Sequence, residues 1–145
     1  MTQQKPVAVG DLTIANDRPL TVIAGPCQLE SADHALMIAE TVMEACAASG
    51  AQFIFKGSFD KANRTSLSGA RGVGLEDGLI IMRAVKEKIG CPVLTDVHTE
   101  GQCALADELI DVLQLPSIHC RQTDLLLAAG RSGAAVDPAS APRTS

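Results

Sequence analysis

Apolar and polar positions along the chain follow two alternating patterns that together predict repeated strand–helix units. Short apolar runs rich in β-branched residues are typical of buried parallel strands. Longer segments in which apolar residues recur at three- and four-residue steps are typical of helices with one buried face. The pattern predicts strands at 20–24, 53–56, 93–96 and 112–115, each followed by a helix, at 31–49, 75–89, 99–109 and 123–131. A fifth strand is expected to begin at 134–136.

Residues at the segment ends support these boundaries. Ser31 is a candidate N-cap, and Gly50 and Gly90 each follow a helical segment, where glycine commonly ends a helix. Thr99 with Gln102 three residues later predicts a capping box. Ahead of the first unit, 7–9 and 12–14 suggest a small hairpin. The first helix is expected to bury one face, formed by Leu36, Ala39, Met43, Cys46 and Ala47.

Polar residues fall just after each predicted strand. They are Cys27 and Gln28, Lys56 and Ser58, Asp96 and His98, and Gln114 and Arg121. Residues at the carboxyl ends of parallel strands gather at one end of the sheet, in a (β/α) barrel and in an open α/β sheet alike. Four units make half of an eight-unit barrel, whose usual length is about 250 residues.

A cationic loop follows the second strand although the whole chain has a net charge of −5. Between 56 and 71 it contains four cations and one acid: Lys56, Lys61, Arg64, Arg71 and Asp60. Lysine supplies a point charge and arginine a planar fork, so this composition suits phosphate or carboxylate. The alternative is a solvated basic surface loop, and the residues alone leave both open.

Composition excludes several other classes of protein. A pI near 5.1 argues against non-specific nucleic-acid binding. No apolar run approaches the roughly 20 residues of a membrane span, and the first residues lack a signal-peptide core. The five cysteines form no CxxC pair, which favours a reducing cytoplasm without a disulfide framework.

Several motifs together resemble those of the 3-deoxy-D-manno-octulosonate 8-phosphate synthase family, whose members are also called 2-dehydro-3-deoxyphosphooctonate aldolases. In order they are AGPC at 24–27, FKGSFDKANRTS at 55–66, RGVGLEDG at 71–78, LTDVH at 94–98, DVLQLP at 111–116 and CRQTDL at 120–125. The resemblance implies a usually tetrameric (β/α)8 TIM barrel. It also implies condensation of phosphoenolpyruvate with D-arabinose 5-phosphate, which releases phosphate and supplies lipopolysaccharide synthesis. A sister synthase that uses erythrose 4-phosphate is the alternative.

The same resemblance assigns site residues. Lys56 and Lys61 resemble the lysines around phosphoenolpyruvate, with Ser58 beside them, and Asp96 is carried over with these lysines as catalytic. The expected contacts to the pentose and its phosphate are Asn63, Arg64 and Thr65. Asp96, Gln114 and Pro116 are expected to line the sugar channel, and Arg121 to lie near its mouth. His98 is left open between a catalytic and a structural role.

Cys27 decides the subclass within this resemblance. Metal-dependent members carry Cys after Gly-Pro, so Cys27 implies a divalent ion such as zinc, iron, manganese or cobalt. Thiolate is a good ligand for zinc. The alternative for a single cysteine is a small buried thiol that behaves as an apolar residue.

The resemblance ends near residue 136. We expect 1–136 to form the amino-terminal half of a barrel, with about the first four β/α units after the hairpin. The proline-rich 137–145 reads as a disordered tail unlike the family. Because the family's remaining ligands have no counterpart, this chain alone is predicted to be an inactive truncated form that does not stay monomeric and soluble. The alternative to an enzyme is that this chain is a truncated protein without catalytic activity.

Overall fold

The computed structural model describes residues 5–59, 74–115 and 135–137. An amino-terminal hairpin precedes alternating strands and helices, as the sequence predicts. The elements are β1 (Val7–Val9), β2 (Leu12–Ile14), β3 (Thr21–Ala24), α1 (Ala32–Ser49), β4 (Gln52–Lys56), α2 (Leu75–Ile89), β5 (Val93–Asp96), α3 (Glu100–Ala106), β6 (Val112–Gln114) and β7 (Ala135–Asp137). The helix predicted at 123–131 lies outside the described residues.

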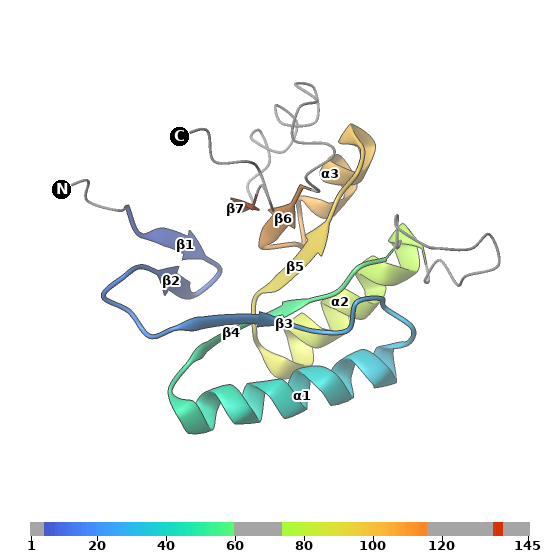
Figure 1. The fold of residues 1–145 in the computed structure, drawn as a ribbon. Helices are drawn as coiled ribbons and strands as arrows, with labels where there is room; N and C mark the ends of the chain where they lie inside the picture. The colour runs from blue at the N-terminus through green and yellow to red at the C-terminus, as the bar shows by residue number, and fades with distance from the viewer. Residues whose placement is uncertain (1–4, 60–73, 116–134, 138–145) are drawn as a thin grey trace.

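The main sheet is parallel, and its strands are neighbours in the order in which they occur in the sequence. The order is β3-β4-β5-β6-β7, so the strand expected from 134–136 is present and pairs with β6. Helices α1 and α2 lie side by side along one face of this sheet (Figure 1). The two-stranded hairpin β1-β2 is a separate antiparallel sheet. The described chain is therefore a mixed α/β protein with a parallel sheet and three helices.

Side chains alternate between the two faces of each strand and build two apolar cores. On the helix face, Phe53, Phe55 and Leu113 pack with the buried residues of the helices. On the opposite face, Ile54, Leu94 and Val112 pack against Val9 of the hairpin, with Leu12 and Ile14 beside it. We call this second side the hairpin face. The hairpin covers the part of it that lies nearer the amino ends of the strands.

The predicted helix ends are largely confirmed. The Ser31 hydroxyl accepts a hydrogen bond from the His34 amide at 3.1 Å. Gly50 and Gly90 adopt the left-handed conformation with φ of 74° and 78°. Helix α3 ends at Ala106 rather than near 109, because the chain turns there to bury Ile110 ahead of β6.

The buried face of α1 differs by one position from the expected one. Ala35, Ala39 and Cys46 are buried, and Leu36 and Met43 are partly buried, but Ala47 is exposed. With 3.6 residues per turn, a face centred on Ala35, Ala39 and Cys46 leaves the residue after Cys46 at its margin. Small side chains at the centre let α1 lie close to the sheet.

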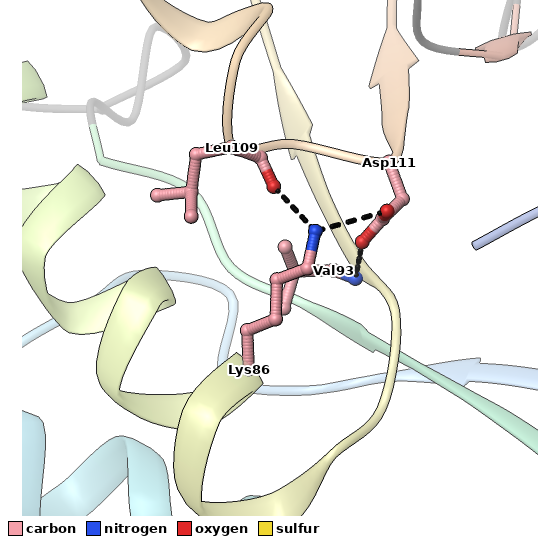
Figure 2. Close-up of polar contacts among 4 residues, drawn as sticks. All are labelled: Lys86, Val93, Leu109 and Asp111. Atoms are coloured by element: carbon pink, nitrogen blue, oxygen red, sulfur yellow. Dashed lines mark hydrogen bonds and ion pairs between the residues drawn. The ribbon is translucent and has the colours of Figure 1, made fainter. Parts of the chain in front are cut away.

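A polar cluster fastens α2 to the amino ends of β5 and β6. The Lys86 ammonium donates to the Leu109 carbonyl at 3.0 Å and to Asp111 Oδ1 at 3.1 Å, while Asp111 Oδ2 accepts the Val93 amide at 2.9 Å (Figure 2). The Lys86 side chain is 38% exposed, so solvent screens its ion pair. Asp111 is more buried than Lys86. Its removal is expected to have the larger effect on stability, because the Val93 amide would lose its acceptor.

We therefore expect Asp111→Ala to lower the free energy of unfolding by about 1–3 kcal/mol, the range for a buried group left unsatisfied. Lys86→Met should have a smaller effect, about 0.2–1 kcal/mol, as expected for a part-exposed pair. Lys88→Met is the matched control, because Lys88 is an exposed cation in the same last turn of α2. Urea unfolding measures all three, and equal effects of the two lysine changes would contradict this role for Lys86.

Candidate active site

Three of the predicted site residues end three adjacent strands on the same face of the sheet. Lys56 is the last residue of β4, Asp96 of β5 and Gln114 of β6. Each stands two positions after a hairpin-face residue (Ile54, Leu94 and Val112), so alternation places all three on that face. Register pairs Asp96 directly with Gln114. The sheet thus gathers a cation, a carboxylate and an amide at its carboxyl end.

Asp96 and His98 form a close pair at this end of the sheet. His98 Nε2 lies 2.9 Å from Asp96 Oδ2, and the two side chains are only 15% and 16% exposed. Burial by itself would raise the pKa of the Asp96 carboxyl. Hydrogen bonds from His98, Ser58 and its own backbone amide, together with the charge of His98, outweigh burial and hold the pKa below its ordinary value. Asp96 is therefore ionised across the neutral pH range.

The segment that follows Lys56 is held in place by backbone contacts. The Leu29 amide donates to the Ser58 carbonyl at 2.8 Å, and the Gly57 amide donates to the Leu94 carbonyl at 3.1 Å. The buried Thr95 hydroxyl donates to the Gly57 carbonyl at 2.7 Å. Sequence reasoning did not single out Thr95. Its signal was a hydroxyl at a position of β5 where alternation expects an apolar residue on the helix face.

Gly25 lies against the backbone of Lys56 with no room for a side chain. A Cβ atom built on Gly25 would lie 1.8 Å from the carbonyl oxygen of Lys56 and 3.1 Å from the Lys56 amide nitrogen. Distances under 3.0 Å to backbone atoms cannot be relieved by a side-chain movement. The chain after β3 thus packs directly on the backbone of Lys56, which makes Gly25 part of the support of this lysine.

Cys27 is exposed in the loop that follows β3. Within residues 5–59, 74–115 and 135–137, no three side chains of His, Cys, Asp or Glu gather as a metal site. The described residues therefore do not by themselves fit a bound divalent ion, and Cys27 stays a predicted ligand. Two other cysteines behave as apolar residues: burial raises the pKa of both the Cys91 and the Cys103 thiol.

Six predicted site residues lie outside the described residues. They are Lys61, Asn63, Arg64, Thr65, Pro116 and Arg121. Their positions relative to Lys56, Asp96 and Gln114 stay predictions, as do the roles assigned to all nine residues and to Ser58.

Among the described helices, none has both the length and the apolar character needed to cross a bilayer.

Comparison with known proteins defines the class. A sequence model of the DAHP synthetase I family matches residues 2–137, so the chain belongs to this enzyme family. Several curated relatives of this chain share one name. The chain is 57% identical over 131 residues to a 2-dehydro-3-deoxyphosphooctonate aldolase of Methylobacterium radiotolerans, covering 90% of this chain and 46% of the relative. It is 51% identical over 134 residues to the protein of that name from Rickettsia bellii (92% and 49%).

A third relative of the same name, from Brucella ovis, is 50% identical over 137 residues, with 94% of this chain and 50% of the relative covered. The resemblance inferred from the motifs is thereby confirmed. The chain spans about half the length of the curated relatives it matches.

Proposed function

We propose that this chain serves the condensation of phosphoenolpyruvate with D-arabinose 5-phosphate to 3-deoxy-D-manno-octulosonate 8-phosphate and phosphate, in the pathway to lipopolysaccharide. The observation that carries this proposal is 50–57% identity to aldolases of that name across about 90% of the chain. The gathering of Lys56, Asp96 and Gln114 at the carboxyl end of one sheet supports it. We propose the phosphorylated three-carbon acid and the pentose phosphate as partners, and a cytoplasmic homotetramer as the assembly.

We further propose that the parallel sheet belongs to a (β/α)8 barrel. Sequential strand order with α1 and α2 on one face supports a barrel, because open doubly wound sheets reverse their strand order and carry helices on both faces. In a barrel the hairpin face is the interior. The hairpin then closes the amino end, and the carboxyl end, with Lys56, is the mouth where such enzymes bind substrate.

The described residues suit particular parts of the reaction. In the first step C3 of phosphoenolpyruvate attacks the aldehyde carbon, a carbon–carbon bond forms, and the aldehyde oxygen takes up a proton. In the second step water adds at C2 and the bond from C2 to the phosphate oxygen breaks, so that the water oxygen becomes the ketone oxygen. Of the two protons that this water loses, one balances the proton taken up by the aldehyde oxygen and the other leaves with phosphate. The positive charge of Lys56 stabilises the anionic groups of phosphoenolpyruvate as charge develops. Asp96, kept ionised, accepts a hydrogen bond from the water or the sugar hydroxyl, and the His98 imidazole is suited to move the proton.

A divalent ion (zinc, iron, manganese or cobalt) held in part by Cys27 completes the proposal as a cofactor. When bound, such an ion polarises an oxygen or lowers the pKa of a water. Because the described residues offer one candidate ligand, no step above depends on it. Activity with and without a chelator tests this cofactor separately.

The choice between the two aldehydes is tested by phosphate release. We expect release from phosphoenolpyruvate to depend on arabinose 5-phosphate and to exceed that with erythrose 4-phosphate on the order of tenfold or more, the usual discrimination between substrates that differ in one group. The assay uses this chain and, in parallel, a version completed with the remaining residues of the Methylobacterium relative. Faster release with erythrose 4-phosphate would favour the sister synthase. Whether the 145 residues alone are inactive, as the sequence predicts, is read from the same comparison.

A further inference from the structure

The turn from β5 into α3 carries a side-chain contact that the reaction proposed above does not use. Asp96 ends β5, His98 follows two residues later, and Gln102 lies in the first turn of α3. The Gln102 side-chain oxygen Oε1 accepts the backbone N–H of His98 at 2.7 Å. In an ordinary capping box this side chain would instead reach back to the N–H of the N-cap residue, which is Thr99. Gln102 therefore holds the residue that carries the imidazole.

The turn is fixed on both sides of this contact. The Thr99 hydroxyl accepts the Gln102 amide at 3.2 Å, which places Gln102 on the helix. The Val97 amide donates to the Gln114 carbonyl at 3.0 Å, and the Val97 side chain is fully buried. His98 is thus anchored through its amide by Gln102 and through its ring by Asp96 at 2.9 Å. With both ends held, the two side-chain torsions of histidine keep little freedom.

We propose that Gln102 is a positioning residue that holds His98 so that its Nε2 atom stays on the Asp96 carboxylate. The proposal rests on the proposed function, because it gives the Asp96–His98 pair a use in that reaction. A ring held with Nε2 toward a carboxylate keeps its N–H at that nitrogen. The imidazole then presents one fixed tautomer and orientation. The hydrogen bond from His98 is also one of the contacts that hold the pKa of Asp96 low.

The test separates positioning from a merely structural role. Gln102→Leu has a similar size but no acceptor, whereas Gln102→Glu replaces the amide oxygen with a carboxylate oxygen that can still accept the His98 N–H. Glu100→Gln is the control, since Glu100 is an exposed residue of the same helical turn. The ¹⁵N NMR shifts of the His98 ring, recorded on the whole chain, are the direct readout. We expect Gln102→Leu to shift the Nε2 and Nδ1 signals toward those of a free imidazole, in which the two tautomers interconvert. Gln102→Glu and Glu100→Gln are expected to leave both signals in place.

Kinetics of the completed enzyme give the second readout. Misplacing a catalytic pair lowers kcat, so Gln102→Leu is expected to reduce kcat on the order of tenfold or more while KM for phosphoenolpyruvate stays near its original value. Gln102→Glu should restore most of the rate. If Gln102→Leu does not fold, Gln102→Ala takes its place in the comparison with Gln102→Glu.

His98 ring signals that do not change when the acceptor is removed would overturn the proposal, even if the variant is less stable. A variant that loses stability while its ring signals and kcat are retained would also overturn it, because Gln102 would then be a helix cap alone. If no chain, including the unchanged one, releases phosphate with either aldehyde, the proposed function fails. The ring signals would still decide whether Gln102 positions His98.

Discussion

Replacing Gly25 with alanine is expected to destabilise the protein by about 4 kcal/mol or more, the range that marks exceptional substitutions. The added Cβ would lie 1.8 Å from the backbone oxygen of Lys56, so β3 and β4 would have to separate where they now pair. Because the obstacle is backbone, no rotamer change relieves it. Urea unfolding followed by circular dichroism measures the loss of stability, and the yield of folded protein gives a second measure.

Gly101→Ala is the matched control for this experiment. The nearest atom to a Cβ at Gly101 is the Thr99 hydroxyl at 4.0 Å, and the position is helical. Alanine is favoured over glycine in helices by about 0.5–1 kcal/mol, so this variant is expected to be equally stable or more stable. If Gly25→Ala unfolds at the same urea concentration as the unchanged chain, the close approach of β3 to Lys56 is contradicted.

Replacing Lys56 with methionine is expected to lower kcat/KM for phosphoenolpyruvate by about 10²–10³, the effect of removing one preorganised group that stabilises transition-state charge. Methionine keeps much of the length of the side chain but removes its charge. Lys56 ends β4 on the hairpin face and is only partly buried, so the fold should tolerate the change. Steady-state phosphate release by the completed enzyme is the measurement.

Lys88→Met removes a cation from the exposed side of α2 and should leave kcat/KM unchanged. The comparison shows whether any effect comes from Lys56 itself or from net charge. Equal activity of the two variants would remove Lys56 from the substrate site, although the family assignment would stand. Lys56→Arg is informative in addition, because arginine keeps the charge but presents a fork rather than a point.

Local sequence signals were enough to place most of the elements. Helix α2 begins and ends where predicted, since acids in its first turn, lysines in its last and Gly90 after it all act within one turn of the chain. Ala47 was placed on the wrong side of α1 because a sequence pattern does not show where the centre of a buried face lies. The capping box at Thr99 was half correct, because its Gln102 side chain bonds to a neighbour that the motif does not include.

The candidate site was predictable where strand alternation determines it. The position of Lys56, Asp96 and Gln114 at strand ends follows from a period of two and from parallel pairing. The contacts that support them do not, because they join segments far apart in sequence. The Thr95 hydroxyl donates a hydrogen bond to the carbonyl of Gly57, 38 residues away in the sequence. Gly25 packs against the backbone of Lys56, and the whole of α1 lies between these two residues in the sequence. No short motif records such contacts.

The hairpin β1-β2 separates the sheet into two ends with different tolerance for change. It covers the hairpin face around Val9, whereas the polar residues lie at the other end of the sheet, where β4, β5 and β6 finish. Replacing the loop at Gly10 or at Pro92 would therefore change the stability of the protein but not the candidate active site. Under the proposed function, redesign of substrate preference would begin at the carboxyl ends of β4, β5 and β6, and stabilising changes could be made separately at the hairpin.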